Sequence, residues 1–268
     1  MGEALEKIKE VRGSVNRAKV GLVVDWDSRW SLWFTRNFHG EDKGYENTVM
    51  EFYRHLIALG VETDIISQNS DLGRYQLVVA PMMFLLEPGI GERIRRYIAA
   101  GGVMLTTYMS GYVNENMLAH LGGFPGDGLM EVLGLENEEI DTLWPDQHNH
   151  VIFNGRQYEA SDYCEVIHTG TAEILGEYGE DWYAGTPAFT VNSFGSGRAF
   201  YLAARLEASG NLAVLESVLR CAGIPTEDLP AGVDHHPRYG QTRRYDFYLN
   251  ETEQEVQLET FRGVSKWR

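Results

Sequence analysis

The chain has 268 residues, of which 43% are apolar and 12% aromatic, which is enough for one large globular domain or a medium domain with an appendage. A net charge of -16 excludes the clustered positive surface that nucleic acid requires. The longest apolar stretch, residues 77–86, is too short to span a bilayer, no signal peptide is visible, and only two cysteines occur, so we expect a cytoplasmic protein.

Buried strands alternate with helices through the first half of the chain. Continuous apolar runs predict strands buried on both faces at residues 19–25, 61–66, 77–80 and 103–108. Apolar residues at helical spacing predict helices at 46–59 and 90–98. This order is that of an α/β domain with a doubly wound, mostly parallel sheet and flavodoxin-like layering, in which we expect the four strands to be neighbours.

Loops at the carboxyl ends of such strands are the expected place for a ligand. Two of them span residues 82–88 and 109–116, and a third, acidic and aromatic, follows the first strand. Its candidate site residues are Asp25, Trp26, Asp27, Trp30, Trp33 and Phe34. Carboxylates beside tryptophans suit a sugar site, but a packed interface also buries such rings, and we place the interface first.

The second half changes in pattern. Short alternating runs from Ile140 to Tyr183 predict antiparallel strands added to the α/β core, after a short helix at 128–135. Runs at 188–192 and 195–203 predict a hairpin. Gly195-Ser196-Gly197 lacks the remainder of a phosphate loop, so we interpret it as the turn of this hairpin. A last helix is expected at 211–221.

Smaller elements are predicted at both ends. Apolar residues at helical spacing predict an amphipathic helix over Glu3–Val15, which is either an arm over the domain or a connector to an upstream part. Near the other end, Gly223-Ile224-Pro225 marks a boundary, and two strands flank residues 251–254. We therefore expect a connector helix at 1–17, an α/β domain at 18–225 and a partial β domain at 226–268.

The turn after the strand at 103–108 is where α/β hydrolases and amidotransferases carry their nucleophile. Here it holds Met109 and Ser110. Methionine cannot act as a nucleophile, no G-x-S-x-G motif is present, and a serine before glycine is usually a plain turn residue, even with His120 as a nearby base in sequence. We interpret Met109 and Ser110 as a degenerate nucleophile elbow and predict no catalytic residue.

Two histidine pairs suggest a metal site, His148 with His150 and His235 with His236. Neither pair has the spacing of helical ligands or a third ligand nearby. We therefore expect solvated histidines, structural cysteines at 164 and 221, no metal and no cofactor.

Several motifs occur together in the order of a known family. They are Val23-Val24-Asp25-Trp26 with Trp30 and Trp33, residues 75–81, 101–111, 120–126, 181–188 and 192–198. Together they cover nearly the whole chain. With them the chain resembles the back half of a family 42 glycoside hydrolase, the bacterial β-galactosidases.

The resemblance implies a trimerisation domain, similar in fold to class I glutamine amidotransferases without their catalytic cysteine. The tail from Val233 resembles the start of the family's small C-terminal β domain. The family's catalytic barrel, which carries the acid/base and nucleophile glutamates, takes about 250 residues and has no counterpart here. We predict a non-catalytic module whose partners are copies of itself, most simply in a homotrimer, or a β-galactosidase barrel.

Two other hypotheses stay open. One is a stand-alone protein that binds galactosides with the segment Asp25–Trp33, and the other is a degenerate amidotransferase-like enzyme. A retaining glycosidase needs two carboxyl groups roughly 5 Å apart, and the sequence singles out no such pair. Titration with galactose or lactose, followed by tryptophan fluorescence, separates sugar binding from assembly.

Overall fold

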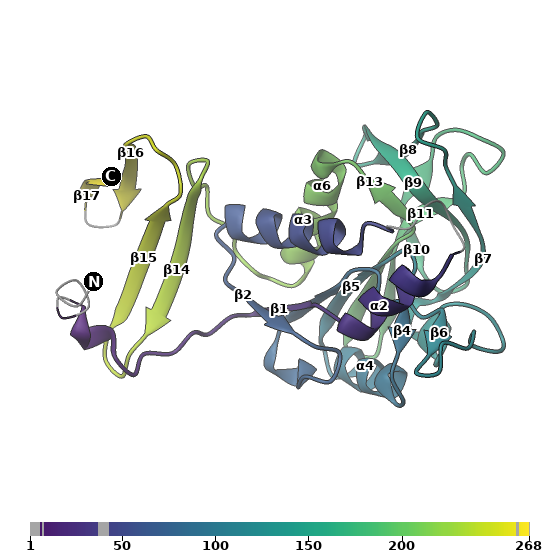
Figure 1. The fold of residues 1–268 in the computed structure, drawn as a ribbon, viewed down its shortest axis with the longest axis horizontal. Coiled ribbons are helices and arrows are strands. Elements are labelled where there is room, and N and C mark those ends of the chain that lie inside the picture. Colours follow the sequence, from purple (N-terminus) through teal and green to yellow (C-terminus); the bar gives the residue numbers. More distant parts are fainter. Residues whose placement is uncertain (1–5, 7, 37–42, 261–262, 268) are drawn as a thin grey trace.

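The computed structural model describes residues 6, 8–36, 43–260 and 263–267. The molecule is elongated, with an α/β body at its centre, an antiparallel extension on the right of Figure 1 and two small hairpins on the left. One sheet of 11 strands runs through the body and the extension.

The predicted parallel sheet is confirmed. Four strands lie side by side and run parallel, in the order β2 (Thr63–Ile66), β1 (Val20–Val23), β3 (Leu77–Ala80) and β5 (Val103–Thr107). A fifth strand, β12 (Gly197–Leu202), pairs with β5 in the same direction. It also forms the predicted hairpin with β11 (Pro187–Phe194), so the sheet changes from parallel to antiparallel at this strand.

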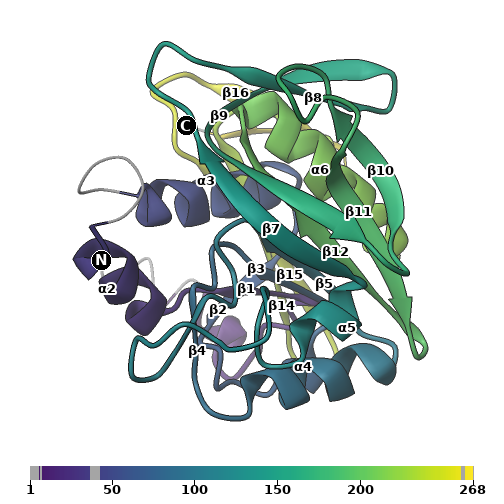
Figure 2. The same ribbon diagram turned by 90° about the vertical axis from the view of Figure 1, so that its right-hand side faces the viewer.

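Helices cover both faces of the parallel strands, as Figure 2 shows. One face carries α3 (Tyr45–Ala58) and α6 (Ala208–Cys221), and the other carries α4 (Ile90–Ala99) and α5 (Leu129–Leu133). Alternate residues of β3 join the two cores: Leu77 and Val79 pack under α3 and α6, whereas Val78 packs under α4 and α5. No helix among the described residues is long and apolar enough to cross a membrane.

The antiparallel strands predicted between Ile140 and Tyr183 are confirmed. Beyond β11 the sheet continues through β10 (Glu173–Tyr178), β8 (Asn149–Phe153), β9 (Arg156–Thr169) and β13 (Ala204–Leu206). A further strand, β7 (Leu135–Thr142), also pairs with β9. The complete sheet is therefore mixed.

Three short elements gather at the carboxyl ends of the parallel strands. They are the helix α2 (Trp26–Phe34), directly after β1, and the strands β4 (Leu85–Leu86) and β6 (Val113–Asn114), which pair in parallel. The 3-10 helix η2 (Leu72–Arg74) directly precedes β3 and therefore lies at the opposite edge. The loops that the sequence placed at this edge are thus found there.

The predicted helix Glu3–Val15 is wrong over residues 8–15; residues 1–5 and 7 lie outside the described residues. Here the chain forms one 3-10 turn, η1 (Lys9–Val11), and Gly13 then takes a φ of 80°. Val15 exchanges two backbone hydrogen bonds of 2.9 Å with Tyr239. A hairpin edge satisfies these backbone groups, whereas a short helix with no core to cover would be marginal in water.

The tail strands form, but their pairing differs from the prediction. β15 (Arg244–Asn250) pairs with β14 (Val233–Tyr239), and β16 (Val256–Thr260) pairs with β17 (Gly263–Trp267). Residues 251–254 therefore connect two hairpins and do not form the turn of one. β14 was missed because its sequence, Val-Asp-His-His-Pro-Arg-Tyr, lacks apolar alternation and contains a proline.

Candidate assembly interface

The acidic and aromatic segment after β1 is a helix, α2, and not the predicted loop. Asp25 is its N-cap, because Oδ2 accepts a hydrogen bond of 2.7 Å from the backbone N–H of Ser28. Gln68 donates to the other oxygen of this buried carboxylate at 2.9 Å. Asp27 lies in the first turn, where the helix dipole favours negative charge.

The amphipathicity of α2 is inverted. Its outer face carries four rings at positions i, i+4, i+7 and i+8, which are Trp26, Trp30, Trp33 and Phe34. Each is more than half exposed, from 51% for Trp30 to 72% for Phe34. The face toward the body carries Ser28, Ser31 and Leu32. A surface helix normally buries its apolar stripe, whereas α2 leaves these four rings in water on the single chain.

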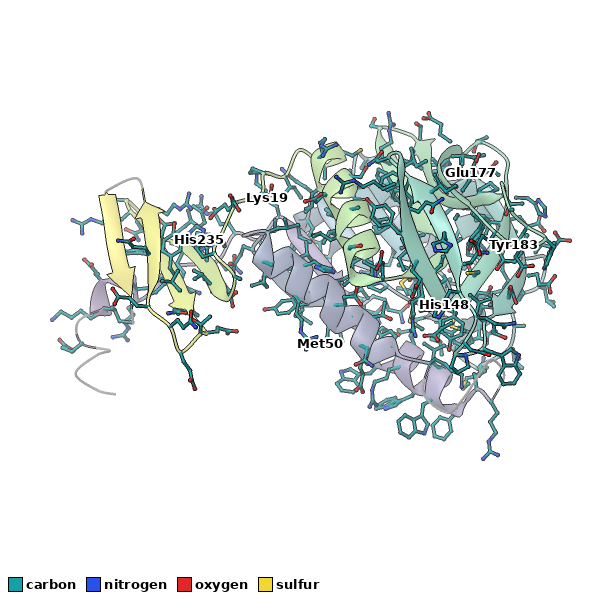
Figure 3. All side chains as sticks on the ribbon, turned by 90° about the horizontal axis from the view of Figure 1, so that it is seen from above. Lys19, Met50, His148, Glu177, Tyr183 and His235 are labelled. Atoms are coloured by element: carbon teal, nitrogen blue, oxygen red, sulfur yellow. The ribbon has the colours of Figure 1, made fainter. Side chains whose placement is uncertain are left out.

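An apolar groove of about 440 Å³ runs between α2, α3 and the edge strand β2. Trp26, Met50 and Ile65 contribute to it from these three elements, and its lining is almost wholly apolar. Met50 lies on the outward side of α3 in Figure 3. The groove continues the rings of α2 toward the sheet edge. We define the apolar face as Trp26, Trp30, Trp33, Phe34, Met50 and Ile65.

Three carboxylates converge at the start of α2. Oxygen atoms of Asp25, Asp27 and Glu87 lie within 4.8 Å of one another. Burial raises the pKa of Asp27, and the nearby charges of Asp25 and Glu87 raise it further. Both oxygens of Asp25 already accept hydrogen bonds, so this arrangement is a helix cap with acidic neighbours.

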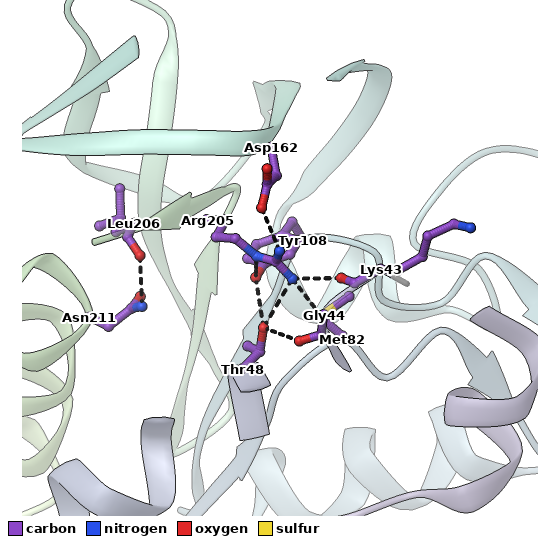
Figure 4. A network of polar contacts seen from close by, with 9 residues as sticks. All are labelled: Lys43, Gly44, Thr48, Met82, Tyr108, Asp162, Arg205, Leu206 and Asn211. Carbon is purple, nitrogen blue, oxygen red and sulfur yellow. Dashed lines mark hydrogen bonds and ion pairs between the residues drawn. The ribbon is translucent and has the colours of Figure 1, made fainter. Parts of the chain in front are cut away.

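A polar network holds the far end of α2. Arg205, in β13, donates to Tyr108 Oη at 2.9 Å, to Asp162 at 2.6 Å and to the backbone oxygen of Lys43 at 2.6 Å, as Figure 4 shows. Lys43 is buried and donates through Nζ to the backbone oxygen of Thr35, the C-cap of α2, at 2.7 Å. The antiparallel extension therefore helps to fix the position of α2.

Met109 and Ser110 lie on the sharp turn after β5. Met109 is buried and has a φ of 57°. The Ser110 hydroxyl is also buried, accepts a hydrogen bond of 3.0 Å from the N–H of Met83 and lies 2.9 Å from the hydroxyl of Thr106. These contacts are those of a structural turn residue.

Glu165 is a buried carboxyl group that sequence reasoning missed. Its Oε1 accepts hydrogen bonds from Met109 N at 2.7 Å and Tyr112 Oη at 2.9 Å, and its Oε2 accepts one from Tyr201 Oη at 2.5 Å. Burial raises the pKa of Glu165 to about 7, although these donors lower it. A glutamate in an alternating strand is ordinarily exposed, so its neighbours in sequence gave no signal.

We expect Glu165→Gln to reduce the pH dependence of thermal unfolding. The folded chain holds this proton more tightly than the unfolded chain, so the carboxyl stabilises the fold below its ordinary pKa of 4.5, and this stabilisation is lost as pH rises through about 7. The loss amounts to about 3 kcal/mol. Melting curves at pH 5 and pH 8 measure it, and exposed Glu173→Gln should behave as wild type. Equal pH dependence in all three proteins would contradict the expectation.

The histidine pairs contact carboxylates of the same chain. His235 is not solvated as predicted: it is buried, with Nδ1 2.7 Å from Glu227 and Nε2 2.9 Å from Asp246. The other contacts are His148 with Glu159, His150 with Glu180 and His236 with Glu62. Burial of His235 has no local sequence signal, because its stacked partner, Tyr248, lies on the other strand of the hairpin.

The two cysteines are separate free thiols. Cys164 is buried in β9, and Cys221 is exposed at the end of α6. Burial raises the pKa of Cys164 to about 12. This thiol is therefore protonated at neutral pH and unsuited to act as a nucleophile.

Comparisons with known proteins identify the family. The model of the β-galactosidase trimerisation domain matches residues 18–225. β-Galactosidase BgaA of Planococcus sp. (strain SOS Orange) is 37% identical over 249 residues, and β-galactosidase Pbg of Clostridium perfringens is 34% identical over 272 residues. The β-galactosidase structures from Rahnella sp. R3 and Bacillus circulans sp. alkalophilus superpose with TM-scores of 0.90 and 0.91, at 39% and 33% identity.

The match covers nearly all of this chain but less than half of each relative. It includes 90% of the chain and 36% of BgaA, and 97% of the chain and 39% of Pbg. For the two structures the shares are 96% with 39% and 99% with 42%. The shared part is an accessory module that does not contain the catalytic barrel. The chain therefore belongs to the trimerisation domain family of the family 42 β-galactosidases.

Proposed function

We propose that the chain assembles with two copies of itself into a homotrimer and supports β-galactoside hydrolysis by a barrel outside these residues. The inverted face of α2 carries this proposal. Its four rings leave on the order of 500 Å² of apolar surface in water, since a large ring covers roughly 200 Å². One side of a standard protein interface covers about 800 Å². With Met50 and Ile65 added, the apolar face has the size expected of a subunit contact.

A sugar site fits the same face less well. A galactoside presents hydroxyl groups, which need several convergent polar partners. The groove is lined almost wholly by apolar groups. At its rim, the guanidinium of Arg29 is engaged by Glu46 and by the rings of Trp26 and Trp33. These contacts favour a protein partner over a galactoside.

The layering of the body supports a likeness to class I glutamine amidotransferases with a degenerate elbow. Parallel strands covered on both faces by helices, and a sharp turn after β5, are the features that such a fold requires. At the turn, Met109 offers no nucleophilic atom, and the hydroxyl of Ser110 is held by Met83 and Thr106. We therefore propose that the chain shares the fold of these amidotransferases but not their chemistry.

The proposed domain division is an assembly domain at 18–225 and part of a small β domain at 226–268. The elements of the body, from β1 to α6, end at Cys221. Among the described residues, the two strands of each tail hairpin pair only with each other, apart from the isolated bridge between Tyr239 and Val15. Residues 8–17, which contain the 3-10 turn η1 and no α-helix, act as a connector. Two free thiols support the cytoplasm as the compartment.

Light scattering coupled to size exclusion tests the proposed assembly. At tens of micromolar protein we expect a single species of three times 30.3 kDa. The physical reason is the apolar face, which a monomer would leave in water. A monodisperse species of 30.3 kDa would contradict the proposal.

A further inference from the structure

A homotrimer with closed threefold symmetry needs two different contact surfaces on each copy. Its contacts are head to tail, so a surface of one copy meets another surface of the next. The apolar face defined above therefore requires a complement elsewhere on the chain. Other exposed large apolar side chains among the described residues lie at 117–121, around Trp144 and Trp182 in the antiparallel extension, and near the tail.

Residues 115–121 form an apolar protrusion directly after β6. Leu121 is 99% exposed and Leu118 62% exposed. Asn114 fixes the turn: its N–H donates to the backbone oxygen of Leu118 at 2.9 Å, and its Oδ1 accepts from the N–H of Leu118 at 3.1 Å. Met117 is held at a φ of 58°, which costs free energy for a residue with a side chain. The tip is thus fixed in an outward position.

The base of the protrusion is equally well anchored. Tyr112 stacks on Phe124 with ring centroids 4.6 Å apart and on Phe84 at 5.7 Å. Its hydroxyl donates to the buried carboxylate of Glu165. The N–H of His120 closes the base by donating to the backbone oxygen of Tyr112 at 3.1 Å. A segment already ordered in this way loses little conformational entropy when it binds.

The protrusion and the groove lie near one another at the same edge of the sheet. β6 pairs with β4, and Leu85 of β4 donates to the hydroxyl of Ser28 in α2 at 3.1 Å. Figure 1 shows α2, β4 and β6 together at this end. In a compact closed trimer both contact surfaces of each copy lie beside the threefold axis, which favours this pair over Trp182, whose neighbour Tyr183 lies at the far end of the antiparallel extension from Met50 in Figure 3.

We infer that the protrusion of one copy docks into the groove between α2, α3 and β2 of the next copy, with Leu118 and Leu121 as the entering side chains. This inference rests on the proposed homotrimer. An apolar tip suits this groove because the surface that the lining exposes is almost wholly apolar, so docking buries few polar groups. The tip supplies the second side of a head-to-tail contact, opposite the apolar face.

Disulfide trapping tests the docking. Met50→Cys and Leu121→Cys are combined in a Cys221→Ser background, because Cys221 is exposed and Cys164 is buried. With diamide as oxidant, we expect covalent trimers of three times 30.3 kDa on non-reducing gels. Each single variant should stay unlinked, and an equal mixture of the two should give covalent dimers. Met50→Cys with Trp182→Cys is the matched control and should not link.

The outcomes separate the docking from the trimer itself. A trimer by light scattering whose Met50→Cys and Leu121→Cys pair does not link, or links within one copy as shown by loss of free thiols without a mass increase, overturns the docking alone. A monomeric wild type overturns both.

A variant without new thiols gives a second readout. Leu118→Ser with Leu121→Ser should weaken trimer formation about tenfold or more, because burial of each leucine is lost. Leu249→Ser, in the tail, should leave assembly unchanged. Unchanged assembly of the Leu118 and Leu121 variant would overturn the docking.

Discussion

Replacing Trp30 and Trp33 with alanine should convert the assembled protein into a monomer of 30.3 kDa. The two rings are 51% and 62% exposed on the outer face of α2, so the single chain does not depend on them for its core. Buried tryptophans at interfaces commonly contribute about 2 kcal/mol or more each. Loss of both therefore weakens each contact by about a thousandfold. Light scattering at the same protein concentration measures the change.

The matched control removes two other exposed tryptophans. Trp144 and Trp182 are 59% and 68% exposed. Figure 3 places Tyr183, the neighbour of Trp182, at the far end of the antiparallel extension from Met50. Trp144→Ala with Trp182→Ala should retain the three-fold mass. Equal loss of mass in both double variants, or loss only in the control, would contradict the placement of the interface on α2.

Arg205→Met should lower the free energy of unfolding by about 3 kcal/mol, because Lys43 O, Thr48 Oγ1 and Tyr108 Oη lose a donor in a largely buried place. The half-exposed Asp162 contributes little to this figure, since solvent screens its ion pair. For a chain of this size the melting temperature should fall by roughly 6–12 °C. Melting curves at one fixed protein concentration measure it, because assembly also raises apparent stability.

Arg96→Met is the control for Arg205→Met. Its guanidinium is 70% exposed and pairs with Glu92 on the same helix at 3.4 Å. Such a pair contributes about 0.5 kcal/mol or less. A fall in melting temperature of the same size in both variants would show that the network around Arg205 contributes no more to the free energy of unfolding than an exposed ion pair does.

The parallel sheet could be predicted because its signal is local. In β3 and β5 every residue is buried, so the strands appear in the sequence as continuous apolar runs between breaks such as Pro81 and Gly101-Gly102. Few secondary structures other than a buried strand fit apolar runs this short. The same locality explains why the six candidate residues from Asp25 to Phe34 were found together, since ten consecutive positions contain them all.

The helical state of α2 was harder to predict. Its apolar rings point outward and its serines inward, which inverts the pattern that indicates a surface helix. Two local features of the sequence do indicate a helix: the spacing of the four rings and an aspartate in the capping position, Asp25. A hydrogen bond from Leu85 N–H to Ser28 Oγ holds the helix against the body. It joins residues 57 positions apart and therefore leaves no local signal in the sequence.

The buried polar groups could not be predicted for the same reason. Arg205 meets Tyr108 across 97 positions, and Glu165 meets Met109 across 56. Each is a charged residue in a strand, which sequence patterns assign to the surface. The amino-terminal segment was mistaken for a helix because its partner, Tyr239, is likewise distant in sequence and supplies the backbone hydrogen bonds that keep it extended.

Hydroxyl-radical oxidation of tryptophans, compared between assembled and diluted, dissociated protein, tests most directly whether the outer face of α2 is the subunit contact. In the single chain Trp30, Trp33 and Trp182 are all at least half exposed, at 51%, 62% and 68%. Assembly through α2 should protect Trp30 and Trp33 severalfold and leave Trp182 equally oxidised in both states. An assembled trimer in which Trp30 and Trp33 are oxidised as readily as in the monomer would contradict the proposed interface.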